Sequence, residues 1–537
     1  MSSKTKQTGI YLALLTLVAT LGGLLFGYDT AVVNGAEKSL VDFFISKITT
    51  DHAYAVSMIT QYKLLVSTVV VLVLAILSSQ ILKLVGKTKG GITVAVLFVA
   101  AIIWIINYVS EAVPTDAALL QDTADSIKGF VISSALVGCI IGGSISGFVS
   151  NSLGRKKGLF ICALAFCVSA IGAWNPDGFN FFFIQDAYSF VIYRIIGGLG
   201  VGLASALSPM YIAEIAPAES RGKLVSFNQF AIIFGMLVIY FVNYFIAKSG
   251  DAQWLTETGW RWMFFSGVIP AGIFFILLFF VPETPRFLIM KGKDEKALAV
   301  LSNIVGEEKA IAEIAEIKET LHEKSSPWLS YGWAVIVIGI LLSVFQQFVG
   351  INVVLYYAGN IFRNMGFDTS SSLLQTIVVG VVNLTFTCVA IVKVDKFGRK
   401  PLMIIGALGM AISMILLGMT FYFQTVGLVS LILMLIYTAA FAMSWGPVTW
   451  VLLSEIFPNS IRGAMSIAVA AQWLANLIVS WTFPILNDNK GLTEMFHQGF
   501  AYWIYGIMGL LAAFFVWKFL PETKGKTLEE IEKFWKK

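Results

Sequence analysis

Three amide side chains lie close together inside one long apolar run. Gln346, Gln347 and Asn352 fall within the stretch from Trp333 to Ala358, and ~20 helical residues cross the ~30 Å core of a bilayer. An unsatisfied polar group is costly in lipid, so these amides should face other protein or a water-filled cavity. Amides at that depth suit a neutral solute rich in hydroxyl groups, such as a sugar. The alternative is a structural role, because Asn and Gln also join helices inside membranes.

Gly350 stands between the two glutamines and Asn352. On an unbroken helix, with 100° per residue, Asn352 would lie about 120–140° around the axis from Gln346 and Gln347. Glycine adopts conformations that interrupt a helix, and interrupted helices often form transporter sites. We therefore predict that the helix breaks at Gly350 and that the break turns all three amides to one side.

A second set of residues could carry protons. Asp29 and Arg194 are the only charged side chains that we expect well inside the core spans. An unpaired charge at such depth is costly, so the two should form a pair. If the pair loosens in another conformation, the freed carboxylate takes up a proton more readily, and protonation can follow a transport cycle. A static ion pair between helices is the structural alternative.

The composition indicates what must hold these residues in place. Hydrophobic residues make up 57% of the 537-residue chain and charged residues 13%, whereas soluble domains carry roughly 25% charged residues. We therefore predict an all-α polytopic membrane protein. The four cysteines show no disulfide or metal-ligand spacing, and we expect no metal and no cofactor. The fourteen expected spans cover residues 10–34, 63–82, 91–108, 129–150, 158–174, 188–213, 223–247, 262–282, 330–361, 372–394, 401–420, 427–453, 464–485 and 499–519.

The basic residues predict the orientation of these spans. An even number of spans puts both termini on one side. Lys and Arg cluster at 155–157, at 396–400 and in the segment 283–329, whereas the loop 175–187 has none. Because cytoplasmic loops carry the excess of Lys and Arg, we expect both termini in the cytoplasm. The net charge of +5 follows from these loops and needs no nucleic acid partner.

Three short motifs occur in the same order in both halves of the chain. The first half reads Gly154-Arg155-Lys156, then Glu214 to Arg221, then Pro282-Glu283-Thr284; the second reads Gly398-Arg399-Lys400, then Glu455 to Arg462, then Pro521-Glu522-Thr523. This order indicates a duplicated bundle with its site between the halves. We expect an N-terminal bundle at 9–282, a cytoplasmic helical linker at 283–329, a C-terminal bundle at 330–520 and a cytoplasmic tail at 521–537. Within the linker, the apolar spacing predicts an amphipathic helix over 294–324.

These motifs, together with Arg194-Ile-Ile-Gly-Gly, Phe227-Asn-Gln-Phe and Trp445-Gly-Pro, resemble the sugar porter family of the major facilitator superfamily. The resemblance covers about 10–34 and 125 to the end. It implies a major facilitator fold with two six-helix bundles in a pseudo-twofold repeat. The family core has twelve helices, so the segment at about 63–108 would be an inserted two-helix hairpin. We expect a peripheral, lipid-facing hairpin; a regulatory or partner-binding role is the alternative.

The resemblance also implies which residues bind the sugar. The hydroxyl partners would be Gln229, Gln346, Gln347, Asn352, Trp450 and Gln472. The aromatic lining, suited to the apolar faces of a pyranose, would be Phe26, Tyr240, Tyr356 and Trp473. Asn383 is a further candidate, although an isolated Asn often joins helices. Met236 stands where the family's xylose carriers have a glutamine, and loss of that amide could weaken xylose binding or favour a hexose.

Charged residues at the cytoplasmic helix ends are candidates for a gate. The expected pairs are Glu214 with Arg221, Glu455 with Arg462, and Asp395 with Arg399, with Arg155 beside them. Exposed pairs contribute only ~0–1 kcal/mol each, so such a gate would have to act as a network. The alternative is that these basic residues only anchor loops on the cytoplasmic side.

The resemblance implies a monosaccharide–proton symporter that imports a pentose, first of all D-xylose, by alternating access. It also implies that the chain lies in the inner membrane of a bacterium. Asp29 and Arg194 would be its coupling pair, since proton-coupled members carry an acid at the position of Asp29. A passive sugar facilitator with the same site is the runner-up. A sugar sensor would need a longer signalling tail than 521–537, and no nucleophile–base pair in the spans supports an enzyme. The expected partners are the sugar, the proton and the lipid bilayer, and we expect a monomer.

Overall fold

The computed structural model describes residues 3–179, 187–217, 220–321, 326–524 and 528–535. Within these ranges every regular element is a helix. Fourteen of the described segments are long and apolar enough to cross a membrane, which confirms the predicted number of spans.

The elements alternate between long helices and short connecting turns. The first half contains α1 (Ser3–Leu40), η1 (Val41–Ile45), η2 (Ser46–Thr49), α2 (His52–Val85), α3 (Lys87–Ser110), α4 (Ala117–Leu153), α5 (Arg155–Trp174), α6 (Ala187–Ile215), α7 (Arg221–Ala247), α8 (Ala252–Trp254), η3 (Leu255–Gly259), α9 (Trp260–Phe265), α10 (Val268–Leu277) and η4 (Leu278–Phe280). The linker contains α11 (Pro285–Met290), α12 (Asp294–Val305) and α13 (Glu307–Leu321). The second half contains α14 (Trp333–Phe348), α15 (Ile351–Tyr356), α16 (Ala358–Asn364), α17 (Thr369–Phe397), α18 (Arg399–Tyr422), α19 (Leu428–Met443), α20 (Trp445–Ile456), η5 (Asn459–Ala464), α21 (Met465–Asp488), α22 (Lys490–Phe496), α23 (Phe500–Phe519) and α24 (Leu528–Trp535).

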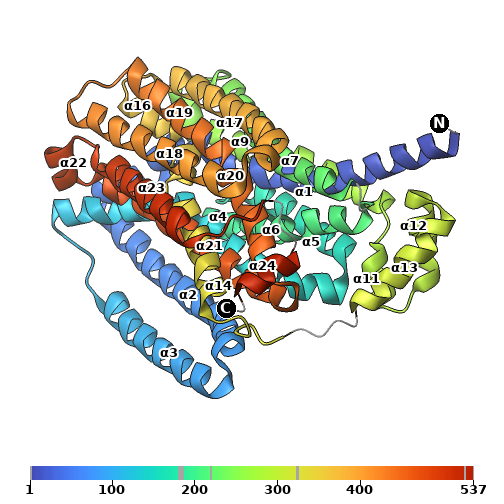
Figure 1. The fold of residues 1–537 in the computed structure, drawn as a ribbon. Coiled ribbons are helices and arrows are strands. Elements are labelled where there is room, and N and C mark those ends of the chain that lie inside the picture. Colours follow the sequence, from blue (N-terminus) through green and yellow to red (C-terminus); the bar gives the residue numbers. More distant parts are fainter. Residues whose placement is uncertain (1–2, 180–186, 218–219, 322–325, 525–527, 536–537) are drawn as a thin grey trace.

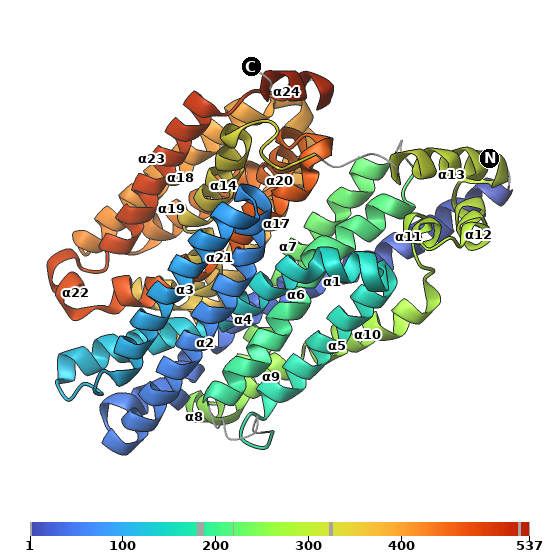
Figure 2. The ribbon, with the colours of Figure 1, turned by 90° about the horizontal axis from the view of Figure 1, so that it is seen from below.

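The long helices form two bundles that lie side by side (Figure 2). In the first bundle α4 and α5 pack on α6, and α1 packs on α7; in the second, α18 packs on α19 and α23, and α14 packs on α21. The bundles meet along two lines, α4 against α21 and α7 against α17. Both termini and the linker helices lie at one end of the molecule, opposite α8 and α22 (Figures 1 and 2). We call these the linker end and the far end.

Side-chain caps fix where several helices begin at the far end. Asp51 accepts a hydrogen bond from the backbone N–H of Tyr54 at the start of α2, and Asp116 accepts one from Ala118 at the start of α4. Such caps satisfy N–H groups that have no partner inside the helix. Several spans therefore extend past their predicted ends: α4 begins at Ala117, well before the predicted start at 129.

The repeated motifs form the same structure in both bundles. The backbone N–H groups of Arg155 and Arg399, at the starts of α5 and α18, donate to the carboxylates of Glu283 (3.0 Å) and Glu522 (3.1 Å). A carboxylate at a helix N-terminus is favourable because the N–H groups and the helix dipole attract negative charge. Burial raises the pKa of Glu283, whereas in Glu522 the opposing effect of the backbone N–H groups is larger and the pKa is lowered.

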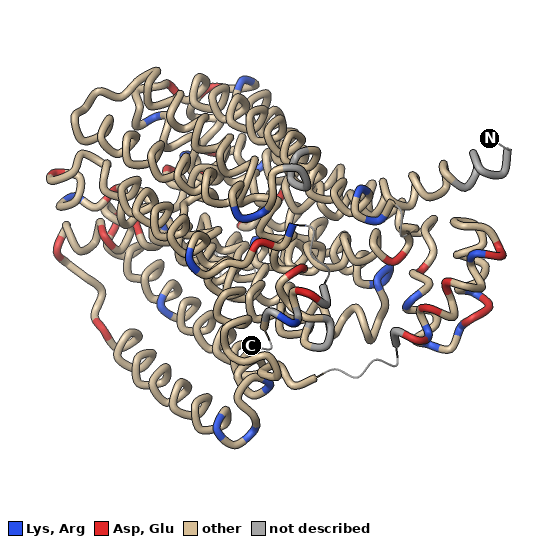
Figure 3. The backbone as a smooth tube through the Cα atoms, viewed as in Figure 1, with Lys and Arg blue, Asp and Glu red and all other residues tan. Residues whose placement is uncertain are grey.

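The linker differs from its prediction. Instead of one helix over 294–324, α12 and α13 are separate helices. They are divided at Gly306, whose φ of 89° is left-handed and ends α12. The last predicted residues, 322–324, lie outside the described residues. Basic and acidic residues are frequent on these linker helices, whereas the middles of the long helices contain few (Figure 3).

The helices α2 and α3 form the predicted hairpin, with Gly86 (φ 87°) at its turn. None of the most apolar stretch of α3 is buried, and α3 lies at the edge of the molecule (Figure 1). In contrast, α2 packs on α4 and also reaches α21: the Tyr62 hydroxyl lies 2.7 Å from that of Ser126, and Ser466 donates to Gln80 (3.3 Å). The hairpin is therefore peripheral at α3 only.

Candidate functional site

The span that carries the three amides is interrupted at Gly350. The helix α14 ends at Phe348, Gly350 adopts φ 92° and ψ 14°, and α15 begins at Ile351. This is the left-handed region, which favours glycine. The ring of Tyr505 fills the space behind it: a Cβ on Gly350 would lie 2.7 Å from the ring.

The break brings the three amides together, as predicted. Asn352 Nδ2 donates to Gln347 Oε1, and Gln347 Nε2 donates to Gln346 Oε1 (3.2 Å). Gln472 Nε2, from α21, donates to the same Gln346 oxygen (2.5 Å), while Gln346 Nε2 donates to the carbonyl of Trp445 (2.9 Å). The amides therefore form one hydrogen-bonded row that is held from two further helices.

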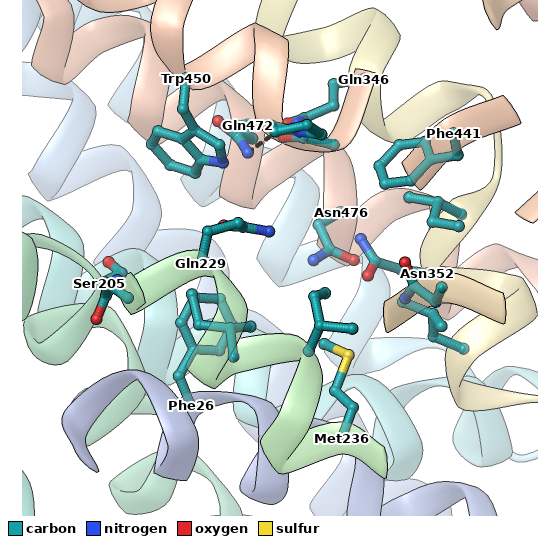
Figure 4. Close-up of a pocket in the computed structure, with 18 of the residues that line it drawn as sticks. Phe26, Ser205, Gln229, Met236, Gln346, Asn352, Phe441, Trp450, Gln472 and Asn476 are labelled. Atoms are coloured by element: carbon teal, nitrogen blue, oxygen red, sulfur yellow. Dashed lines mark hydrogen bonds between the residues drawn. The ribbon is translucent and has the colours of Figure 1, made fainter. Parts of the chain in front are cut away.

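This row borders a cavity of about 300 Å³ between the two bundles, at the lower end of the ~300–1,000 Å³ usual for small-molecule sites. In Figure 4, Gln229 and Met236 lie opposite the amides of the second bundle. The predicted residues that line the cavity are Phe26, Gln229, Met236, Gln346, Gln347, Asn352, Tyr356, Asn383, Trp450, Gln472 and Trp473.

Tyr240 is the one predicted sugar-contacting residue that does not line this cavity. Its buried hydroxyl donates to the carbonyl of Leu355 (3.2 Å), so it joins α7 to α15. Tyr240 follows Met236 by one helical turn toward the far end, and Leu355 lines the cavity in front of it. The predicted role of Tyr240 in the lining is therefore wrong, and the residue closes the structure behind the cavity.

Several lining residues were not predicted from the sequence, among them Asn476, Asn228, Ser205 and Phe441. Asn476 had a usable signal, since it follows Gln472 by four residues and therefore lies on the same helix face. Ser205 and Phe441 had no comparable signal, because a small or aromatic residue in an apolar run is usual for helix packing.

Several buried polar atoms at the cavity have no hydrogen-bond partner among the described residues. They are Gln472 Oε1, Trp473 Nε1 and Asn228 Oδ1. Buried polar atoms are usually hydrogen-bonded, so unpaired ones call for an explanation. Both acceptors and a donor are present, and this mixture matches hydroxyl groups, which donate and accept.

Asp29 and Arg194 form the predicted pair. Arg194 Nη1 lies 2.8 Å from Asp29 Oδ1, and Nη2 donates to the Asp29 carbonyl (2.9 Å). Arg194 is fully buried and also lies over the ring of Phe264. Asp29 Oδ2 has no partner among the described residues, and a cavity of about 10 Å³ borders Asp29, close to the smallest volume that holds a water. On α1, Asp29 follows the cavity residue Phe26 by about one turn.

Further charged side chains are buried in the described spans, among them Glu37, Asp125 and Lys128, so the prediction that Asp29 and Arg194 are the only ones was wrong. Glu37 lies in α1, which continues to Leu40, and Lys128 lies in α4. They pair with each other at 3.1 Å. The predicted first span ends at 34 and the next core span begins at 129, so the prediction places Glu37 and Lys128 in loops.

The charged motifs at the linker end pair within each bundle. Arg155 contacts Glu214 (2.7 Å), and Arg399 contacts Glu455 (3.0 Å). Glu214 was expected to pair with Arg221, but Arg221 is exposed. The cause is that the start of α5 packs beside the end of α6 and brings Arg155 closer. The side chains of Asp395 and Arg462 lie outside the described part of the chain.

The cavity extends toward the linker end. Its lining includes Ser226, in the first turns of α7, and Val451 and Ile391, near the ends of α20 and α17. At the far end, contacts between the bundles close it: Asn34 donates to the Leu355 carbonyl (2.9 Å). Among the described residues, no group of three or more His, Cys, Asp or Glu side chains could hold a metal ion.

Comparison with known proteins identifies the family. A family model described as "Sugar (and other) transporter" matches residues 98–535. The D-xylose-proton symporter of Escherichia coli (strain K12) is 52% identical, with 99% of this chain and 97% of that protein covered. The glucose facilitated diffusion protein of Zymomonas mobilis is 41% identical over 78% of this chain and 89% of that protein. The inward open conformation of the xylose transporter XylE from E. coli superposes with a TM-score of 0.76 at 50% identity and covers 98% of this chain and 100% of that one. The chain is therefore a member of the sugar transporter family, the sugar porters of the major facilitator superfamily.

Proposed function

We propose that the protein imports a monosaccharide together with a proton by alternating access. The observation that carries this proposal is the cavity between the bundles, whose wall combines a row of amides with aromatic rings. The buried Asp29–Arg194 pair begins about one helical turn from that wall. A proton on Asp29 would weaken its bond to Arg194, and both residues belong to helices that pack together. Phe26 and Gln229 in the cavity wall belong to the same first bundle, so sugar and proton would both act on that bundle.

D-xylose is the first candidate for the sugar. The relative that is 52% identical is named for D-xylose and proton symport. Gln229, Gln346, Gln347, Asn352, Trp450 and Gln472 would bind its hydroxyl groups, with Phe26, Tyr356 and Trp473 against its apolar faces. Asn383 would contribute a further amide. Met236 makes one part of the wall apolar, which would leave room for a hexose with its extra hydroxymethyl group.

We infer that the linker end faces the cytoplasm. The positive-inside rule favours this orientation, since Lys and Arg gather on the linker and the adjoining helix ends (Figure 3). Both termini would then be cytoplasmic, and the structure would be inward-facing. The charges around Arg155, Glu214, Arg399 and Glu455, with Arg221, Asp395 and Arg462, would act as a cytoplasmic gate in the other state.

One copy of the chain would be the working unit. Both walls of the cavity come from the same chain, so a monomer has a complete site. The proposed division into an N-terminal bundle at 9–282, a linker at 283–329, a C-terminal bundle at 330–520 and a tail at 521–537 follows the repeated motifs.

The test is the pH change that a sugar causes in a weakly buffered suspension of de-energised cells that express the protein. Xylose, arabinose, glucose and galactose are added separately, and labelled-sugar uptake is followed in parallel. External alkalinisation with one sugar identifies it as the symported substrate. Equilibration of labelled sugar with no pH change would contradict proton coupling.

A passive facilitator is the second candidate. It is favoured by the relative named as a glucose facilitated diffusion protein, at 41% identity. In that case Asp29 and Arg194 would be a static pair, and sugar would equilibrate without accumulation.

A further inference from the structure

Four charged side chains join the two bundles at the far end. Lys128 Nζ lies 3.1 Å from Glu37 Oε1 and 2.9 Å from Asp488 Oδ2, and Arg363 Nη2 pairs with Glu37 Oε2. The order Asp488–Lys128–Glu37–Arg363 alternates in sign and is neutral in total. We call these four residues the far-end ion chain.

Its middle is buried. The side chains of Glu37 and Lys128 are 2% and 9% exposed, whereas those of Arg363 and Asp488 are 20% and 24% exposed. Exposed ion pairs are weak because water screens them, but a buried charge that loses its partner is strongly unfavourable. Breaking the ion chain therefore costs more free energy than breaking an exposed ion pair.

Two of its three links run between the bundles. Glu37 (α1) and Lys128 (α4) belong to the first bundle, and Arg363 (α16) and Asp488 (α21) belong to the second. Further hydrogen bonds between the bundles lie beside them: Asn489 Nδ2 donates to Asp122 Oδ1 (2.9 Å), in addition to the bond from Asn34 to Leu355 described above. The far end is thus closed by a cluster of polar bonds between the bundles.

The linker end is arranged differently. The pairs Arg155–Glu214 and Arg399–Glu455 each stay within one bundle. Separation of the bundles at that end leaves both pairs intact, whereas separation at the far end must break the links from Lys128 to Asp488 and from Glu37 to Arg363. The ion pairs therefore favour a structure that is closed at the far end and open at the linker end.

We propose that the far-end ion chain is the outer gate of the transporter. It holds the cavity closed on the far side, breaks whenever the bundles rock to the opposite state, and so sets the ratio of the two states. This inference rests on alternating access, as proposed above, but needs neither a particular sugar nor proton coupling. After opening, Glu37 and Lys128 still neutralise each other within the first bundle, which makes the break reversible.

The geometry of the far-end ion chain allows a double variant that removes only the links between the bundles. Arg363→Gln combined with Asp488→Asn removes both links between the bundles and leaves the buried Glu37–Lys128 pair intact. The matched control is Lys38→Gln with Asp42→Asn, which removes an ion pair within the same end of the first bundle. Both double variants delete one positive and one negative charge, so net charge does not distinguish them.

The measurement is the distance between spin labels at the far end of the two bundles. The labels are attached through Thr50→Cys, directly after η2, and Glu494→Cys, on α22, because both positions are exposed. The native cysteines that are not fully buried, Cys167 and Cys388, are replaced by Ser. Electron–electron dipolar spectroscopy of the full chain, without sugar, gives the populations of short and long distances. We expect the ratio of long to short distances to rise at least tenfold in the Arg363→Gln/Asp488→Asn variant and to change less than twofold in the control.

Two outcomes would overturn the gate. One is a gate variant that keeps the wild-type sugar affinity and melting temperature and also the wild-type distance distribution. The other is an equal shift in the control, which would mean that any lost ion pair at this end has the same effect. If the gate variant shifts while the wild type shows no sugar-dependent pH change, the gate stands and symport fails; the reverse result removes the gate alone.

Discussion

Replacement of Asp29 by Asn should separate proton coupling from sugar binding. Asn keeps the size of the side chain and a carbonyl oxygen that can accept the bond from Arg194 Nη1, now at 2.8 Å. The second bond, from Nη2 to the backbone carbonyl of residue 29 (2.9 Å), does not involve the side chain at all. What the variant loses is the ability to gain or release a proton.

The expected loss can be stated as a concentration ratio. A membrane potential of 100 mV contributes ~2.3 kcal/mol per proton, which sustains ~40-fold accumulation of sugar when one proton is coupled. Asp29→Asn should reduce this ratio to about 1. Loss of one partner of a buried ion pair costs ~3–5 kcal/mol, and we expect the retained hydrogen bonds to keep the cost of this variant at the lower end, so that the protein still folds.

The assay compares two kinds of transport in proteoliposomes. Uphill uptake of labelled xylose is driven by an imposed potential and pH gradient, and counterflow is driven by unlabelled xylose inside. The variant should lose the first and keep the second. Asp177→Asn is the matched control, because Asp177 pairs with Arg261 away from the cavity, and it should keep both. Undiminished uphill uptake in Asp29→Asn would refute the coupling role, and loss of counterflow in a folded variant would make the residue structural.

Three further substitutions test the site. Gln346→Ala removes the centre of the amide row and should weaken sugar binding ~5–150-fold, since a buried partner left unsatisfied costs ~1–3 kcal/mol; binding titration measures this, and unchanged affinity would exclude the row from the site. Met236→Gln adds an amide to the wall and should raise the preference for xylose over glucose roughly 2–10-fold in a competition assay; no change in preference would count against Met236 as a selectivity position. Gly350→Ala should destabilise the protein by about 1–3 kcal/mol, because it combines a left-handed φ with a contact to Tyr505. Gly366→Ala, at a similar φ but in open space, should lower the melting temperature less; an equal loss would mean that the contact with Tyr505 is unimportant.

The break at Gly350 was predictable because it depends on local information. Polar residues at mid-membrane depth must find partners, and the helical period shows that Asn352 and the two glutamines cannot share a face unless the helix is interrupted. The pairing of Asp29 with Arg194 was predictable for a similar reason, since two opposite charges at similar depth have few other partners.

The far-end ion chain was not predictable from the same sequence. Each of its residues stands just outside a predicted apolar run: Lys128 directly precedes one, and the other three follow the end of one. Glu37 and Lys128 are buried only because helices distant in the chain pack over them, and hydropathy contains no information on that packing. The predicted partner of Glu214 was wrong for the same reason. The repeat indicates where the motif lies in the sequence but not which helix end lies beside Glu214 in the structure.

The hairpin of α2 and α3 determines which of the two junctions between the bundles contacts the surrounding lipid. The bundles join along α4–α21 and along α7–α17, and α2 lies against the first of these lines through Tyr62 and Gln80. When the bundles move, acyl chains can enter the α4–α21 junction only by displacing α2. At the α7–α17 junction we expect acyl chains to contact both bundles directly. Lateral pressure in the bilayer would then act on the carrier from one side only. Membrane thickness and acyl-chain order should therefore tune its turnover through the α7–α17 flank.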